Sequence, residues 1–165
     1  MKTLIFFISI TALSLLRPDV SLIRKEYKEA AISKAKTKVL YKKLKGITKK
    51  DDKVLVAYKG AVIALIARQQ KGAENKKDFF KKGIELLEYA LKCQPNNIEI
   101  RFVRLTIQQN SPTFLNYNAQ KEEDKAFILR HLESVKSSEL KKYIIDYILK
   151  SKHFTKEEKS VFLWL

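Results

Sequence analysis

The sequence predicts an all-α protein of about six or seven helices, arranged as antiparallel hairpins in a single domain over residues 18–165. Apolar residues recur at spacings of three and four through most of the chain, which is the period of amphipathic helices. Glycine (4) and proline (3) are scarce among 165 residues, so few of the tight turns that join short strands can form. Hydrophobic residues at 45% and charged residues at 32% are typical of a globular domain with a real core.

The first element is interpreted as a signal peptide over residues 1–17. Lys2 precedes an apolar run from Leu4 to Leu16 that only three hydroxyl residues interrupt. This run is shorter than the roughly 20 residues of a membrane-spanning helix and suits the core of an export signal. The alternative is a first core helix of a cytosolic domain, although the run has no polar face. We therefore expect an exported, periplasmic protein whose mature chain has no transmembrane segment.

Residues 24–53 predict a strongly basic helix. Twelve Lys or Arg residues stand against four acids there, a local net charge of +8. One face carries the residues that we expect to point inward: Ile23, Tyr27, Ala30, Thr37, Tyr41 and Leu44. The lysines mostly cover the other side, which is interpreted as a solvated helix face. The functional alternative is a basic surface for an acidic partner, anionic lipid or polysaccharide, with Lys36, Lys42 and Lys43 as the candidate residues.

Three further helices follow in the middle of the chain. Asp51 or Asp52 caps the first, whose apolar stripe runs from Val54 towards Gly72. The second runs from about residue 76 until Pro95 stops it, because proline has no backbone N–H to donate. Asn96 or Asn97 caps the third, which extends to about residue 110 with Ile98, Phe102 and Leu105 on its inner face.

The helical pattern fails at residues 110–120 and resumes after them. This stretch contains a proline and three asparagines, and we expect it to form a lid in which Phe114, Leu115 and Tyr117 pack on the core; a functional loop is the alternative. The next helix begins with an acidic cluster, residues 122–124, that suits the positive end of the helix dipole. A helix capped at residue 137 or 138 follows, and a capping box from Thr155 to Glu158 starts a short last helix.

The reactive side chains predict no enzyme, metal site or cofactor. Cys93 is the single cysteine, so no internal disulfide is possible, and we expect it to be a buried small hydrophobe. His131 and His153 are 22 residues apart, and only Glu157 stands near one of them at helical spacing. Four glycines form no phosphate-binding loop, and no nucleophile-elbow motif is present.

The net charge of +16 needs a separate interpretation, because such an excess often indicates nucleic acid as a partner. The excess is 28 Lys against only 6 Arg, whereas Arg is the usual residue for bidentate phosphate contacts. No recognised DNA- or RNA-binding motif is present. Nucleic acid is therefore an alternative only if the chain is not exported.

Residues 83–97, GIELLEYALKCQPNN, carry a more specific pattern. Gly83 and Ala90 are small, Leu87 between them is large, and Pro95 follows five residues after Ala90. This segment resembles the second helix and exit turn of a tetratricopeptide repeat, in which small residues let paired helices approach closely. Gly60 stands 23 residues before Gly83, farther than the repeat allows, so the flanking repeats are degenerate.

The resemblance implies a tetratricopeptide-like arrangement or a small α-solenoid that does no chemistry. Such scaffolds bind peptides or protein partners in a groove. Arg101 and Arg104, three residues apart on a side of their helix that lies away from the apolar stripe or at its border, are the candidate groove residues; the alternative is that both are only solvated. We therefore predict a non-catalytic protein-binding or scaffolding module of the bacterial envelope.

Overall fold

The computed structural model describes residues 18–163, so the predicted signal peptide lies outside the described residues. This part of the chain is all-helical, with eight α-helices, and confirms the all-α fold class. The helices are α1 (Val20–Ala30), α2 (Lys34–Lys43), α3 (Lys53–Ala67), α4 (Ala73–Cys93), α5 (Ile98–Asn110), α6 (Lys121–His131), α7 (Ser138–Lys150) and α8 (Lys156–Ser160). Two short 3-10 helices, η2 (Thr113–Leu115) and η3 (Leu132–Ser134), follow α5 and α6.

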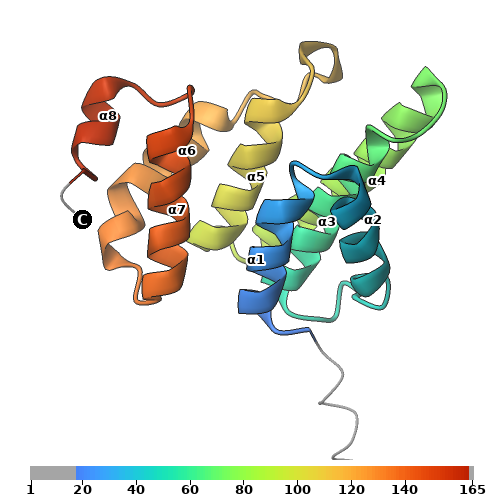
Figure 1. Ribbon diagram of the computed structural model, residues 1–165, viewed down its shortest axis with the longest axis horizontal. Coiled ribbons are helices and arrows are strands. Elements are labelled where there is room, and N and C mark those ends of the chain that lie inside the picture. The colour runs from blue at the N-terminus through green and yellow to red at the C-terminus, as the bar shows by residue number, and fades with distance from the viewer. Residues whose placement is uncertain (1–17, 164–165) are drawn as a thin grey trace, which may run out of the picture.

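The helices alternate in direction (Figure 1). The odd-numbered helices α1, α3, α5 and α7 all run upward in this view, and the even-numbered ones run downward. The carboxyl ends of α1, α3, α5 and α7 therefore lie at one edge of the molecule, together with the connections that follow them. None of the helices between residues 18 and 163 combines the length and the apolarity that a membrane crossing requires.

α3 and α4 pack against each other with their backbones in close contact. A Cβ atom built on Gly60 would lie 2.5 Å from the carbonyl oxygen of Gly83, and one built on Gly83 would lie 2.5 Å from that of Gly60. No side chain fits at either position, so the two glycines set the distance between the helices. Leu87 and Ala90, farther along α4, are fully buried.

α5 contributes to two hydrophobic clusters. Ile100, Val103 and Ile107 belong to the larger one, which α1 to α4 complete. Phe102 and Leu105 belong to the second, which contains residues of α6 and α7 and also Phe154 and Phe162. The apolar stripe predicted for α5, with Ile98, Phe102 and Leu105, therefore covers only one of its two buried faces.

The prediction of one helix over residues 24–53 was wrong, because the chain turns back after α1. The Ser33 side chain caps the first turn of α2, and the Thr37 hydroxyl donates to the carbonyl of Ala30 at 2.7 Å. These bonds satisfy backbone groups that a helix end leaves open. A continuous helix would have placed Lys34 in the apolar seam, whereas the turn leaves this lysine exposed. The split also explains why residues 18–163 form eight α-helices and not the six or seven that we expected.

The predicted capping residues are confirmed. Asp52, Asn97 and Ser137 accept backbone hydrogen bonds at the starts of α3, α5 and α7, and Thr155 and Glu158 form the complete capping box of α8. The prediction for the 110–120 connection holds for Tyr117, which packs edge-on against Phe80 with ring centroids 5.8 Å apart.

Two predictions of burial were wrong. Phe114 is 79% exposed and belongs to η2, none of whose residues is buried. Cys93 is also exposed, since it is the last residue of α4 and lies beyond the face that Ala90 and Leu91 bury.

Candidate functional site

The edge at which α1, α3, α5 and α7 end carries two neighbouring grooves with apolar linings. The first groove has a volume of about 350 Å³. It lies between the end of α3, the start of α4, the end of α5 and the connection that follows α5. Leu65, Phe80, Ile107, Phe114 and Leu115 supply its larger apolar side chains.

The polar side chains of the first groove include three cations and no acid. Arg68 lies at the end of α3, and Lys76 and Lys77 lie in the first turns of α4. The Arg68 guanidinium donates to the carbonyl of Asn110 at 3.0 Å, which ties the end of α3 to the end of α5. None of these three cations forms an ion pair with another residue between positions 18 and 163. Their charges are therefore available to a ligand.

The second groove, also about 350 Å³, lies between α1, α5 and α7. Three tyrosines (Tyr27, Tyr143 and Tyr147) form much of its lining, and Lys28, Asp146 and Lys150 are its charged residues outside the shared wall. The wall shared by the two grooves consists of Leu65, Arg68, Ile107 and Asn110. The two grooves are therefore adjacent parts of one surface.

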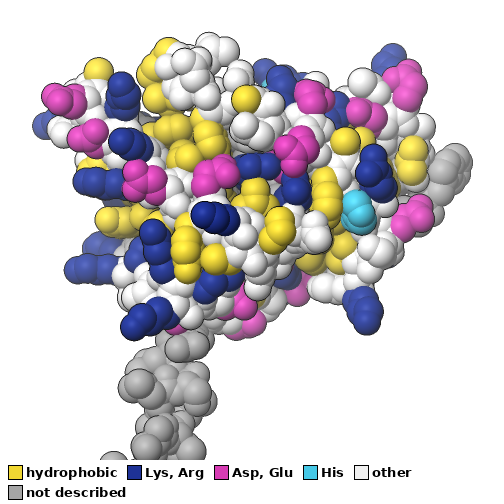
Figure 2. Space-filling view, turned by 180° about the vertical axis from the view of Figure 1, so that it is seen from behind, with side chains coloured by type: hydrophobic (Ala, Val, Ile, Leu, Met, Phe, Trp, Pro, Cys, Tyr) yellow, Lys and Arg dark blue, Asp and Glu magenta, His cyan; other side chains and the backbone are white. Residues whose placement is uncertain are grey.

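Each groove has an unusually exposed apolar side chain at its border. Phe114 is 79% exposed beside the first groove, and Ile32 is 90% exposed beside the second. Seen from behind, Lys and Arg side chains gather over the side on which α4 lies, and hydrophobic side chains are visible near them (Figure 2). The surface thus combines apolar groups that water solvates poorly with a surplus of positive charge.

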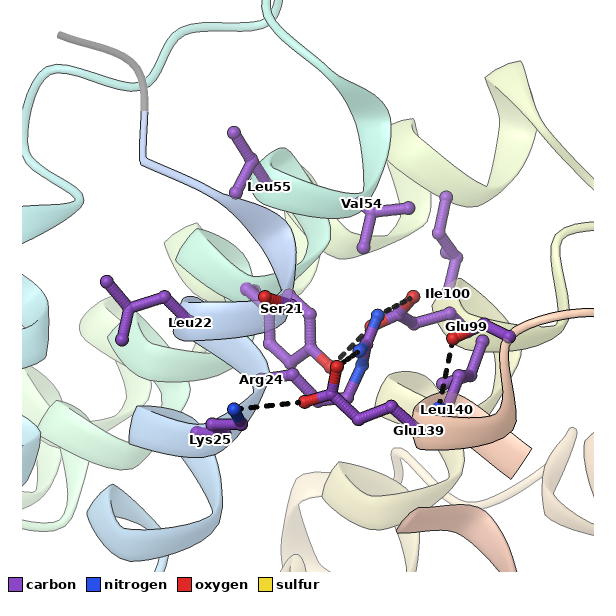
Figure 3. Close-up of polar contacts among 12 residues, drawn as sticks. Ser21, Leu22, Arg24, Lys25, Val54, Leu55, Glu99, Ile100, Glu139 and Leu140 are labelled. Atoms are coloured by element: carbon purple, nitrogen blue, oxygen red, sulfur yellow. Dashed lines mark hydrogen bonds and ion pairs between the residues drawn. The ribbon is translucent and has the colours of Figure 1, made fainter. Parts of the chain in front are cut away.

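A buried ion pair holds α1 in place near the amino-terminal ends of α5 and α7, away from the grooves (Figure 3). The Arg24 guanidinium donates to the Glu99 carboxylate through Nε at 2.8 Å and through Nη2 at 3.0 Å. The Tyr58 hydroxyl donates to the same carboxylate at 2.8 Å. Glu139 lies 3.6 Å from both Arg24 and Lys25 and extends the network to α7. Because burial disfavours the phenolate, the pKa of Tyr58 is raised well above its ordinary value.

The sequence analysis missed this network, although one signal was present. Arg24 and Glu99 are 75 residues apart, so no local spacing connects them. Arg24 does stand next to Ile23 and three residues before Tyr27, on the face that was predicted to be buried. A charge at such a position requires a buried partner, because an unpaired buried charge is very costly.

Arg101 and Arg104, the candidate groove residues, bind α6 instead of facing either groove. Arg104 is 5% exposed, and its guanidinium donates to both carboxylate oxygens of Asp124, at 2.6 and 2.7 Å. Arg101 donates to Asp124 and to Glu123, each at 2.9 Å. The hydrogen bond to Glu123 lowers the pKa of its carboxyl group. The acidic start of α6 therefore has a structural role besides its fit to the helix dipole.

A second contact links Arg104 to the connection after α5. Its Nη1 atom lies 3.2 Å from the Glu88 carboxylate of α4, which also accepts a hydrogen bond from the Tyr117 hydroxyl. Burial, and next the Glu88 charge, raise the pKa of Tyr117. Glu88 therefore joins α4 to α5 and to the connection that follows it.

Lys36, Lys42 and Lys43, the other candidates, are exposed on α2. Lys36 lies 2.8 Å from Glu29, and Lys43 lies 2.6 Å from Glu26, so both pair with α1. Exposed ion pairs of this kind contribute only about 0–1 kcal/mol to stability, and a charged ligand can compete for them. The three lysines therefore remain accessible to an acidic surface.

The residues with catalytic or metal-binding potential lie apart. His131 stacks on Phe127, with ring centroids 4.1 Å apart, and its Nδ1 atom lies 2.8 Å from the carbonyl of Phe127. Partial burial, together with neighbouring lysines, lowers the pKa of His153. Within residues 18–163, no three His, Cys, Asp or Glu side chains come together in a way that could hold a metal ion.

Comparisons with known proteins add no further assignment. The sequence matches no protein-family profile, and no curated protein or solved structure is significantly similar to it. The described features are those of an all-helical protein with two adjoining apolar grooves and a basic surface.

Proposed function

We propose that this chain is a non-catalytic protein-binding or scaffolding module, built of repeat-like helical hairpins and exported to the bacterial envelope. The observation that carries the proposal is the pair of adjoining apolar grooves at the edge where α1, α3, α5 and α7 end. A partner that covers Phe114 and Ile32 removes apolar surface from water, which stabilises a complex by about 25 cal/mol per Å². Open clefts between helices are a common place for apolar anchors of a partner.

The packing of α3 on α4 supports a relationship to tetratricopeptide repeats. In such a repeat, small residues stand where paired helices cross, and Gly60 and Gly83 occupy such a crossing here. Leu87 and Ala90, the next positions in the resemblance, are fully buried. The connection between the two helices spans only residues 68–72, whereas α4 has 21 residues and begins ten residues before Gly83, so the extra separation of Gly60 and Gly83 lies in a longer helix. We therefore propose one repeat-like hairpin among divergent ones.

The test is affinity capture of the native protein from its own cells, with mass spectrometry of the proteins that it retains. A Phe114→Ser, Ile32→Ser double variant removes one exposed apolar side chain beside each groove. The matched control, Val39→Ser with Val161→Ser, removes two apolar side chains that are 67% and 59% exposed away from the grooves. We expect the groove variant to lose partners that the control retains. Equal capture by all three proteins would refute the proposal.

A second candidate function is adhesion to an anionic lipid or polysaccharide surface. The net charge of +16 and the exposed lysines of α2 favour it. In that case, affinity should fall steeply as salt rises to physiological concentration, where exposed charges are screened over about 8–10 Å. Reversing Lys36, Lys42 and Lys43 to Glu should then abolish binding while the fold survives. Binding that tolerates both treatments would favour the grooves.

A further inference from the structure

We infer that the first groove binds an acidic protein segment that carries two or three apolar side chains. This inference rests on the proposed function and names the chemistry of the partner. It follows from the size of the groove, from its lining and from the charges around it.

The size and lining of the groove fit a short segment. Ala67, Gly72 and Ala73 contribute little or no side chain to the lining, and this leaves space between the larger walls of Phe80 and Phe114. A volume of about 350 Å³ lies near the lower end of the range for ligand clefts, roughly 300–1,000 Å³. The groove therefore fits a few apolar side chains and is too small for a folded domain.

The charges of the groove favour acidic groups on the ligand. Arg68, Lys76 and Lys77 line the groove without an acid opposite them. The start of α4 at Gly72 and Ala73 also belongs to the lining, and α4 has no side-chain cap. The positive end of its helix dipole lies at this border of the groove, where Glu74 in the first turn, outside the lining, offsets part of it. A neutral segment would gain nothing from these charges, and a basic one would be repelled by them.

The distribution of the cations favours a polypeptide over a lipid or a polysaccharide. Lys28 and Lys150 extend the positive charge into the second groove, beyond the shared Arg68, and Asp146 is the one acid in that lining. A single lipid headgroup would compensate only one part of this series, whereas an acidic chain can place several carboxylates along it. A polysaccharide has no apolar side chains for the walls that Phe80, Ile107 and Phe114 form.

The experiment uses the native protein and a fluorescein-labelled peptide of about 14 residues, or four helical turns. Leu and Phe recur in this peptide every three or four residues, and Glu or Asp fills the other positions. One control peptide has the same composition in scrambled order, and a second has Lys in place of every acid. We expect fluorescence anisotropy at physiological salt to show saturable binding of the first peptide only. Equal binding of the scrambled peptide would overturn the inference.

Matched variants test whether the peptide occupies this groove. Lys76→Glu with Lys77→Glu should weaken binding at least about tenfold, because each reversal replaces an attraction by a repulsion. Lys38→Glu with Lys45→Glu changes the net charge by the same amount at two exposed positions on and just after α2, and should weaken binding less than about threefold. Equal weakening by the two pairs would mean that the total charge, and not the groove, attracts the peptide.

Two further results separate this inference from the proposed function. Phe114→Ser should weaken peptide binding, while circular dichroism shows an unchanged helix content. If the acidic peptide fails to bind but cellular partners are still lost with the groove variant, the ligand chemistry is wrong and protein binding stands. If capture is unchanged in that variant, the proposed function itself fails. Binding to phosphatidylglycerol vesicles in place of the peptide would overturn the inference in favour of a lipid.

Discussion

Replacing Gly83 with alanine should force α3 and α4 apart. The new Cβ atom would lie 2.5 Å from the carbonyl oxygen of Gly60 and 2.7 Å from the backbone nitrogen of Ala64. Both neighbours are backbone atoms of a helix, so neither can rotate away as the end of a side chain can. The contact can be relieved only if one helix shifts relative to the other.

The expected loss of stability follows from two opposing terms. Overpacking a close contact costs about 1–3 kcal/mol, and the backbone neighbours of Gly83 place this site near the upper value. Alanine in a helix interior is more favourable than glycine by about 1 kcal/mol, which offsets part of this cost. The net loss is then about 2 kcal/mol. For a chain of this size, that loss lowers the melting temperature by roughly 4–8 °C.

Thermal and urea unfolding, followed by circular dichroism, measure this loss against a control in the same chain. A Cβ atom on Gly46 would meet no atom within 4 Å, so Gly46→Ala should leave stability unchanged or raise it slightly, by up to about 1 kcal/mol. Gly60→Ala should behave like Gly83→Ala. The variant with both substitutions should lose less stability than the two single variants together, because one displacement of the helices relieves both contacts. A Gly83→Ala protein that melts at or above the wild-type temperature would refute the close packing of the two helices.

Other perturbations test the rest of the structure. Arg24→Met leaves the Glu99 carboxylate buried without its ion-pair partner and should cost about 3–5 kcal/mol in urea unfolding, whereas apolar replacement of both residues should recover much of this loss. Ala90→Leu should cost about 1–3 kcal/mol in the same assay, because Ala90 is fully buried. Burial raises the pKa of Tyr27 to about 12, so the folded state favours the neutral phenol. The stabilising contribution of Tyr27 should therefore be intact below about pH 10, and the free energy of unfolding should fall by up to about 3 kcal/mol as the pH rises through 12. Urea unfolding measured across this pH range should show a smaller fall for Tyr27→Phe. N-terminal sequencing of the native protein should find a mature start between about residues 15 and 22, and an intact Met1 on a cytosolic protein would contradict export.

Features that depend on neighbouring residues could be predicted from the sequence. The caps at Asp52, Asn97 and Thr155 follow from a side chain and backbone groups only two or three residues away. The crossing near Gly83 was also predictable, because a glycine inside an otherwise good helix needs a packing reason. The turn at Ser33 was missed because the inward residues on both sides keep a nearly helical spacing across it.

Features that depend on distant residues could not be predicted. Arg104 is on the side of α5 away from its predicted stripe, but α6 returns along that side and buries it against Asp124. The sequence shows only that an arginine and an acidic cluster are both present. The groove residue Phe114 was expected to be buried, because an apolar residue in a connection does not reveal whether a neighbouring segment covers it. The candidate site therefore forms only when distant helices pack together, and no single stretch of the sequence predicts it.

The double role of α5 has a consequence for the way the chain is made. During synthesis, α1 to α4 leave the ribosome first, but their hydrophobic cluster lacks Ile100, Val103 and Ile107, and Arg24 lacks Glu99. The amino-terminal half therefore stays incomplete until α5 emerges. Once α5 has docked, its opposite face presents Phe102 and Leu105 as the surface on which α6 and α7 assemble. The two halves of the protein should then gain and lose their structure together, in one cooperative transition, because each exposes one face of α5 if the other unfolds.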